Sequence, residues 1–445
     1  MFRLLWNRLQ TTIWFIPALL SLTALGTALL SINADLHTDS SSWKWLEYFR
    51  IGTAGVRQVL AVTTGAMMTI TGVVFSISVV TLTLAANQFG AKLLRNYLSD
   101  TRNKLVLGLF IGSFLFGLVV LASIDSEPGS DVPALAFMVS LVLTMIAIAG
   151  LIYFIHNIST SIQADRLIAI IGRNLQETIA GTLSTEHNST DTDALREKWR
   201  LATHGESALP AVAGHSGYVE YINYEALLAL AARSRCALEI PVRPGDFVVE
   251  GTPVAVILPL AGQAGPDGGD ICRHISLGEQ RTNVQDLEYS IMQLIQIALR
   301  ALSPGVNDAL TAIACIDWLS AALACMAGRR FPPAYLTDND GTVRLKIRAF
   351  DFSGAVDAVF KPLRQNARGN EMVTIRLLEA LAAIMQVCRS PSRLQALREH
   401  ADAIQRTAEQ HFTDRDDIDQ ATQRHDACVA VFRQQYRSAA GSLDT

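Results

Sequence analysis

The first residues with a spacing that suits chemistry are three hydroxyl side chains within a long uncharged stretch. Residues 58–91 contain no Asp, Glu, Lys or Arg. Thr64, Thr71 and Ser78 recur there every seven residues, which places them on one side of an α-helix that turns about 100° per residue. Hydroxyls offer a permeating ion or water a hydrogen-bonding wall without fixed charge, so these three are candidate pore-lining residues. The open alternative is that each hydroxyl only bonds to the carbonyl four residues earlier.

A second row on the same stretch consists of small residues. Gly65, Thr69, Gly72 and Ser76 lie about a third of a turn away from the hydroxyl row. Gly65/Thr69 and Gly72/Ser76 are each a pair of small residues four apart. In lipid, close packing and hydrogen bonds drive helix association because the hydrophobic effect between helices is weak. This row is therefore the candidate helix-packing face.

A third group of polar residues surrounds a helix break in the second half of the chain. A helix is expected from about Val284 to Leu302, and the sequence Ser-Pro-Gly at 303–305 ends it. Asn307 or Asp308 then caps a very apolar helix that reaches about Met326. Charges beside buried faces are costly unless paired. The group forms either a binding pocket at the turn or a buried ion network that fixes two helices, and its members are Asp286, Arg300, Ser303, Asn307, Asp308 and Asp317.

Other chemistry is not indicated. The chain shows no Ser-His-Asp order, nucleophile elbow or HExxH motif, and its Gly-rich stretch at 261–282 lacks the GxxxxGK[ST] pattern of a phosphate loop. The six cysteines form no CxxC pair. A net charge of −4 gives no footprint of nucleic-acid binding. We predict a protein that is not an enzyme, with no catalytic residue, metal site, cofactor or nucleic-acid partner.

The elements that position the first two rows are membrane spans. Charged residues make up 18% of the chain, below the usual 25% or so of soluble proteins. Each of four apolar runs has about the 20 residues needed to cross a bilayer. The first run is longer than the apolar part of a signal peptide and lacks a suitable cleavage site, so we expect it to be retained. The runs lie at about 12–32, 58–91, 105–124 and 132–155.

The orientation follows from the Lys and Arg residues that flank the spans. If the N-terminus is inside, the inner flanks carry eight of these residues and the outer flanks three. Both termini are therefore expected in the cytoplasm, together with all six cysteines, which suits a reducing compartment. The residues expected at the cytoplasmic mouth of the second span are Asn87, Gln88, Lys92 and Arg95.

The chain divides into four predicted regions. Residues 1–156 form the four-helix transmembrane domain, and residues 157–207 an amphipathic linker helix and joint. Residues 208–260 alternate in polarity around an Arg-Pro-Gly-Asp turn, which predicts a small β-rich, barrel-like subdomain. Residues 261–445 form a mostly α-helical domain with a strand near 343–350. The fold class is an integral membrane α-helical protein with a cytoplasmic mixed α/β region.

Four stretches carry a resemblance to a known family. They are TLAANQFGAKLLRNYLSD, LGLFIGSFLFG, RPGDFVVEGTPV and IALRALSPGVNDALTAIACIDWL. Together they resemble the bacterial predicted-membrane-protein family known as domain of unknown function 2254. Two places differ from the family pattern: QFGAK, with Lys92, replaces Gln-Phe-Ser-Pro-Arg, and Ala309 stands where proline is common. The resemblance implies an inner-membrane protein with a cytoplasmic C-terminal region, and it implies no activity.

The leading functional hypothesis is an oligomeric bacterial inner-membrane protein that acts as a passive channel for ions or small solutes. Its cytoplasmic region would gate it through the helix at about 151–185. The four runs contain no charged side chain, which argues against an ion-coupled transporter. The alternative is a membrane-anchored sensor or scaffold whose cytoplasmic domain binds a ligand or a partner protein. The expected partners are the lipid bilayer, further copies of the chain, and an ion or small molecule of open identity.

Overall fold

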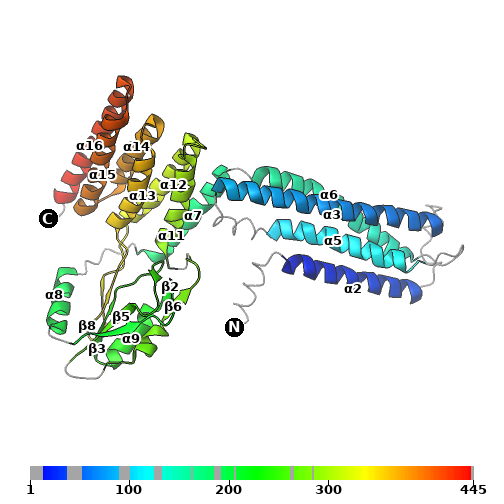
Figure 1. Cartoon of the computed structure of the whole chain (residues 1–445), viewed down its shortest axis with the longest axis horizontal. Helices are drawn as coiled ribbons and strands as arrows, with labels where there is room; N and C mark the ends of the chain where they lie inside the picture. Colours follow the sequence, from blue (N-terminus) through cyan, green and yellow to red (C-terminus); the bar gives the residue numbers. More distant parts are fainter. Residues whose placement is uncertain are drawn as a thin grey trace. The chain divides into compact units, whose positions relative to one another are not determined.

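The structure is a computed structural model that describes most of the chain. The described residues are 14–37, 53–89, 101–124, 133–161, 164–184, 192–204, 207–260, 265–282 and 285–441. They form two compact units that divide between Gln163 and Ala164, named here the N-terminal and the C-terminal unit. Figure 1 shows the elements of both, and each unit is described by itself.

The N-terminal unit is a group of long apolar helices. Its described helices are α2 (Phe15–His37), α3 (Thr53–Phe89), α5 (Thr101–Ala122) and α6 (Ala134–Ser161). By length and composition, five of the described helices could cross a membrane. Four of them are these helices. The fifth, α12 (Ala309–Ala327), belongs to the C-terminal unit.

Helix α5 packs against α2, α3 and α6. Its glycines permit the close approach: a Cβ atom on Gly108 would lie 2.7 Å from Leu20 Cδ1, and one on Gly112 would lie 3.2 Å from Ala24 Cβ. Gly117 meets the side chain of Thr64 on α3 in the same way. Small residues at a crossing let two backbones approach in lipid. Three glycines of α5 therefore bring helices of the N-terminal unit together.

Asp35, near the end of α2, holds the start of α6. Its two carboxylate oxygens accept hydrogen bonds from the backbone N–H groups of Leu135 and Ala136, each at 3.0 Å. The first N–H groups of a helix have no partner within the helix, so a carboxylate there is favourable. This bond ties two helices that are 100 residues apart in the chain.

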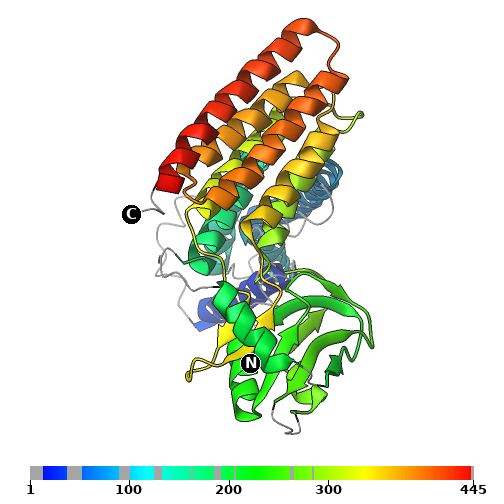
Figure 2. The same cartoon turned by 90° about the vertical axis from the view of Figure 1, so that its left-hand side faces the viewer.

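The C-terminal unit is mostly helical, as the composition and periodicity indicated. Figure 2 shows its long helices side by side, with the sheets at one end of them. Each helix expected from the sequence beyond residue 284 overlaps an observed one. The helices are α7 (Ala164–Thr182), α8 (Thr192–Thr203), α9 (Tyr224–Arg233), α10 (Gly268–Cys272), α11 (Leu287–Ala301), α12, α13 (Phe352–Asn366), α14 (Glu371–Val387), α15 (Pro391–His411) and α16 (Arg415–Gly441).

Asx caps begin many of these helices. The side chains of Asn223, Asp286, Asp308, Asp351 and Asn370 each accept a hydrogen bond from a backbone N–H three residues later. Such a cap satisfies a donor that the helix itself cannot. The caps explain why α11 begins after Asp286 and why α12 begins after Asp308, at the end of the 302–308 turn.

The β-strands of this unit form two sheets around one core. The five-stranded sheet has the order β1-β5-β3-β8-β7, and the three-stranded sheet has the order β4-β2-β6. Only β3 and β8 pair in parallel. The strands are β1 (Leu209–Val212), β2 (Gly217–Ile222), β3 (Cys236–Ile240), β4 (Phe247–Val248), β5 (Pro253–Pro259), β6 (Ile275–Gly278), β7 (Tyr335–Thr337) and β8 (Val343–Ile347).

The β-rich part is larger than the sequence indicated. Val219 and Ile222 of one sheet share a buried cluster with Leu238 and Leu345 of the other. Strands β6, β7 and β8 come from beyond residue 260 and complete these sheets. Among the described residues the strands therefore form two sheets around a common core, and a closed barrel is not seen.

Candidate functional site

The predicted pore-lining row consists of one buried residue, Thr64, and two half-buried ones, Thr71 and Ser78. Thr64 is 6% exposed, and it lies against Gly117 of α5. The hydroxyl of Thr71 donates to the carbonyl of Met67 at 2.7 Å, and that of Ser78 donates to Val74 at 2.7 Å. For these two residues the structure thus has the bond that the alternative interpretation described.

The predicted packing row lies open in the single chain. A Cβ atom on Gly65 or Gly72 would meet nothing within 4 Å, and Thr69 and Ser76 are exposed. The row therefore faces away from the other helices of its unit, toward lipid or another copy of the chain.

The residues predicted at the cytoplasmic mouth are only partly described. Asn87 and Gln88 lie in the last turn of α3, whose backbone alone is described there. Lys92 and Arg95 lie outside the described residues.

The six residues predicted around the 302–308 turn separate into distinct places. Asp286 begins α11 and Asp308 begins α12. They are about 22 Å apart along α11, at 1.5 Å for each of its 15 residues. Asp317 instead pairs with Arg376 of α14, with 2.5 Å between its Oδ1 and the guanidinium Nε. No single pocket or network contains all six.

The turn itself is held by local bonds. The Asp308 carboxylate accepts from Thr311 N at 3.1 Å and from Thr311 Oγ1 at 2.6 Å, and these bonds hold the pKa of Asp308 below its usual value. Ser303 donates to the carbonyl of Arg300 at 2.7 Å. Asn307 has a φ of +47°, which Asn tolerates better than most residues. Arg300 is exposed.

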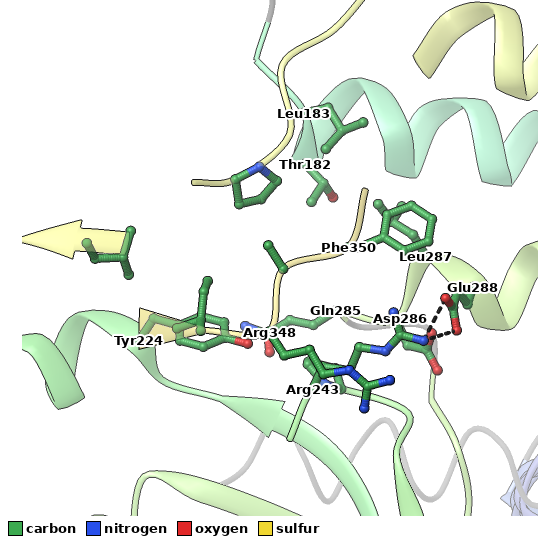
Figure 3. A pocket seen from close by; sticks show the side chains of 15 residues that line it. Thr182, Leu183, Tyr224, Arg243, Gln285, Asp286, Leu287, Glu288, Arg348 and Phe350 are labelled. Carbon is green, nitrogen blue, oxygen red and sulfur yellow. Dashed lines mark hydrogen bonds and ion pairs between the residues drawn. The ribbon is translucent and has the colours of Figure 1, made fainter. Parts of the chain in front are cut away.

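A cavity of about 340 Å³ lies inside the C-terminal unit, where the sheets meet the helices. Figure 3 shows it with its lining side chains. We name it the junction cavity. Its volume falls in the range of about 300–1,000 Å³ that small-molecule sites occupy. It is lined by residues 182–183, Tyr224, 243–244, 285–288, Pro332, Leu336 and 347–350.

One wall of the junction cavity is a set of paired charges. Arg243 lies 2.7 Å from Glu288, measured between guanidinium and carboxylate atoms. Asp286, whose side chain is 3% exposed, lies 2.6 Å from Arg281. Burial raises the pKa of Asp286, while the bonds from Arg281 and from Tyr289 N oppose that rise. Each pair satisfies its own charges, so this wall is rigid and close to neutral.

Gly245 explains why the Arg-Pro-Gly-Asp turn fits against α11. Its φ is +93°, and a Cβ atom there would run into the Asp286 carboxylate and the Arg281 guanidinium. Glycine is the residue for which both the dihedral angle and the close approach are free of strain. The turn between β3 and β4 therefore sits directly on the cap of α11.

Gln285 joins the same wall to the three-stranded sheet. Its amide accepts from Ile222 N at 2.9 Å and donates to Ile222 O at 3.1 Å, as a neighbouring strand would. The start of α11 is therefore bonded to β2 as well as to the turn that contains Gly245.

Tyr224 and Arg348 are two polar groups of the lining that lie outside the pairs Arg243–Glu288 and Arg281–Asp286. Burial, with a smaller effect of the Asp246 carboxylate, raises the pKa of Tyr224 to about 12, so its hydroxyl stays protonated. Arg348 is 56% exposed and donates to Asp246 at 3.1 Å. Both are labelled among the lining residues of Figure 3. Together they offer one hydroxyl and one guanidinium beside an otherwise apolar floor that includes Leu183, Leu287 and Phe350.

An aromatic cluster stands behind Phe350. The ring centroids of Phe331 and Phe350 are 5.8 Å apart, and the guanidinium of Arg393 lies 5.0 Å from the ring of Phe331 and 5.4 Å from that of Phe352. Arg393 also donates to the carbonyls of Ala327 at 3.0 Å and of Arg329 at 2.8 Å. It thereby holds the end of α12 beside the cavity.

The sequence did not single out most of these residues. Arg243, Gly245 and Asp246 stand in a recognised turn, yet their contact with α11 comes from the tertiary fold. Tyr224, Gln285 and Arg348 carry no local signal of a site. Among the described residues, no three His, Cys, Asp or Glu side chains gather as metal ligands.

The fold and the site define a class of protein: a multi-span helical membrane unit joined to an α/β unit that contains a small-molecule-sized cavity. The sequence profile of the family described as "Predicted membrane protein (DUF2254)" matches residues 10–383. Uncharacterised proteins of Mycobacterium bovis and Mycobacterium tuberculosis H37Rv are each 30% identical to the chain over 420 residues, which cover 92% of this chain and 78% of the relative. No solved structure is significantly similar. The chain therefore belongs to this family of membrane proteins, and the resemblance drawn from its sequence is confirmed.

Proposed function

We propose that the protein is a membrane-anchored sensor whose C-terminal unit binds a small, largely apolar molecule in the junction cavity. The observation that supports this is the set of elements around the cavity. Its lining joins the last turn of α7 to β7 and β8 of the five-stranded sheet and to the start of α11. Two residues separate the end of α6 from the start of α7, so a ligand that shifts the last turn of α7 acts on the helix that directly follows a span in the chain.

The lining defines the chemistry of this ligand. Its charges are compensated by Arg243–Glu288 and Arg281–Asp286, so a highly charged molecule would disturb them. The Tyr224 hydroxyl and the Arg348 guanidinium can bond one acceptor at the edge of an apolar body. No catalytic step is proposed, because the carboxylates of the wall are engaged in ion pairs and caps.

Thermal shift of the full chain in nanodiscs tests the sensor proposal. The probes are fractions of small apolar molecules extracted from bacterial cells. Ala349→Trp fills the cavity, and Ala202→Trp on the exposed face of α8 is the matched control. At least one fraction should raise the melting temperature of the wild type and of Ala202→Trp but leave Ala349→Trp unchanged. If every fraction shifts all three proteins equally, the cavity is not the site.

We further propose that four helices, α2, α3, α5 and α6, cross the bacterial inner membrane with both termini in the cytoplasm. The flanking Lys and Arg residues support this orientation. Helix α12 is equally apolar, but α7, α11, α13 and α14 pack around it, and burial within a domain accounts for an apolar helix as well as lipid does. The orientation predicts that a reporter protein that works only in the cytoplasm is active when fused after residue 445. A reporter that works only outside the cytoplasm should be inactive at the same position.

A channel formed by several copies of the chain is the second candidate function. The supporting observation is α3, which exposes Gly65, Thr69, Gly72 and Ser76 on one face and has no charged residue between Gln58 and Phe89. In a homo-oligomer this face would pack against another copy or line a path between copies. Purified protein in liposomes should then pass ions, and Ser76→Trp should reduce the flux. Absence of flux under voltage, tension and pH change would exclude the channel and leave the sensor standing.

A further inference from the structure

An apolar apex lies at the end of the C-terminal unit where the chain enters it. The apex is the turn that connects α11 to α12. Val306 is 56% exposed and Leu310 is 68% exposed, although both belong to the most apolar part of the unit. Large exposed apolar side chains that stand together usually mark an interaction surface.

The position of the apex follows from the way α7 packs on α12. Gly172 of α7 lies against the ring of Trp318 of α12. Arg329, just after α12, donates to the carbonyls of Ala180 and Leu183 at 3.2 and 2.9 Å. One contact lies at the middle of both helices and the other at their C-terminal ends, and Gly172–Trp318 and Leu183–Arg329 are each 146 residues apart, so α7 and α12 run parallel. Leu310 and Ala164 each precede the Gly172–Trp318 contact by eight residues, about 12 Å along their helices, and are therefore level with each other.

The covalent chain limits the distance between Ala164 and the candidate membrane span of α6. The candidate span of α6 ends at Ile158, and α6 itself ends at Ser161. Two residues, 162 and 163, separate Ser161 from Ala164, so their Cα atoms are at most about 11 Å apart at 3.8 Å per residue. The bound holds for every angle between the two units. Val306 precedes Leu310 by four residues and so lies further toward this end.

The charges beside the apex suit the surface of a bilayer. Arg166 on α7 and Arg300 on α11 are exposed, and both lie within the first or last turn at this end of their helices. Apolar side chains next to arginines are typical of segments that lie in the lipid headgroup region. The acidic neighbours are Asp165 and Asp308, of which Asp308 is engaged by Thr311.

We propose that the turn at 303–310 inserts Val306 and Leu310 into the lipid headgroup region and so docks the C-terminal unit on the membrane. The occupant of this apolar surface is lipid, not a second protein. The docking is a property of the surface and does not depend on the junction cavity being a ligand site. Membrane docking would give the loop between α11 and α12 a role in addition to capping α12.

Site-specific photocrosslinking of the full chain in liposomes tests this. Benzoylphenylalanine is placed at position 306 or 310, and at 387 as the control. Val387 is 48% exposed and lies at the opposite end of the unit, since Arg393, just after it, bonds to carbonyls at the end of α12. Mass spectrometry should find phospholipid adducts at 306 and 310 at least tenfold above position 387. Equal lipid adducts at all three positions, or adducts to another copy of the chain, would overturn the proposal.

A second measurement keeps the test independent of the bulky probe. In nanodiscs, Leu310→Asp should raise the hydrogen-exchange rate of amides 305–310 several-fold, because a carboxylate does not enter the headgroup region as leucine does. Val387→Asp, at an exposed position away from the apex, should leave those amides unchanged. If Leu310→Asp also leaves them unchanged while crosslinking to lipid is absent, the turn faces water.

Discussion

The two units of this protein satisfy their buried polar groups by different means. In the N-terminal unit, hydroxyls such as those of Ser21, Thr63 and Thr144 donate to carbonyls of their own helix. In the C-terminal unit, Asx caps and pairs such as Arg376–Asp317 join separate elements. A hydroxyl therefore reveals little about its neighbours in the first unit, where carboxylate and amide groups such as Asp35 and Asn103 provide the links between helices.

This difference decides where each unit is vulnerable. Helices in lipid associate through close packing, so the contacts that matter in the N-terminal unit are those of glycines. In the C-terminal unit the corresponding contacts are those of the turn that contains Gly245 and of the ion pairs at the start of α11. Substitutions can be chosen that damage one kind of contact and leave the other intact.

The largest effect is expected from Gly108→Leu on α5. A Cβ atom there would lie 2.7 Å from Leu20 Cδ1 and 3.0 Å from Pro17 Cα, and backbone cannot move aside as a side chain can. The free energy of unfolding should fall by about 3 kcal/mol or more, the upper part of the range for overpacking. Denaturation in mixed detergent micelles measures it.

Gly72→Leu is the matched control, since a Cβ atom added there on α3 meets nothing within 4 Å. A monomer should lose no more than about 0.5 kcal/mol. A large loss at Gly72 together with a change of oligomeric state would show that the exposed row of α3 packs against another copy. Equal losses in a chain that stays monomeric would contradict the packing of α5 described here.

In the C-terminal unit, Gly245→Ala should cost about 2–4 kcal/mol. About 1–2 kcal/mol comes from the positive φ, and the remainder from the collision with Asp286 and Arg281. Gly341→Ala is the control, because Gly341 has a φ of +74° but open space around it. The difference between the two variants, measured by thermal denaturation in nanodiscs, isolates the contact between the turn and α11. Identical losses would mean that this contact contributes nothing.

The sequence predicted the helices and strands better than the tertiary contacts between them. Hydrophobic runs located α2, α3, α5 and α6, and Asp308 was recognised as a cap. The β-rich part was drawn too small because β8 pairs with β3 across about 100 residues, and no local pattern encodes such a pairing. The group around the 302–308 turn was treated as one site, whereas the length of α11 separates Asp286 from Asp308.

The two rows on α3 show the same limit. Their spacing predicted two faces, but the side that meets α5 is set by the shape of α5. Gly117 accommodates Thr64, so the hydroxyl row turns inward and the small-residue row outward. Which of two compatible faces is buried depends on the partner helix, and a helix's own sequence does not contain that information.

A smaller effect is expected from pH, through His400 on α15. Its ring bonds to Asp357 at 2.8 Å. Burial lowers the pKa of His400 below its ordinary 6.5, with Lys361 and Arg364 acting in the same direction and Asp357 opposing them. The unfolded chain then binds a proton more readily than the folded one, so stability should fall as pH drops below about 6.5 and level off below the folded pKa.

The measurement is the melting temperature of the full chain between pH 7.5 and 5. His400→Gln should flatten this dependence, because an amide can bond to Asp357 without titrating. His411→Gln on the same helix, where His411 is exposed, should leave it as in the wild type. A pH dependence that survives in His400→Gln would assign the titration to another group.

The smallest effects on stability are expected from substitutions in the hydroxyl row. They distinguish Thr71, whose hydroxyl bonds to its own helix, from Thr64, whose hydroxyl has no hydrogen-bond partner among the described residues. Thr71→Val removes a bond to the residue's own backbone, and stability should change by less than about 0.5 kcal/mol. Among the buried side-chain atoms that the structure describes, Oγ1 of Thr64 has no hydrogen-bond partner. Thr64→Val should therefore stabilise the protein by up to about 1 kcal/mol, because it removes a buried unsatisfied group. A substantial loss of stability in Thr64→Val would instead mean that this hydroxyl is bonded in the assembled protein, and the inward row would then have a polar partner that a single chain does not supply.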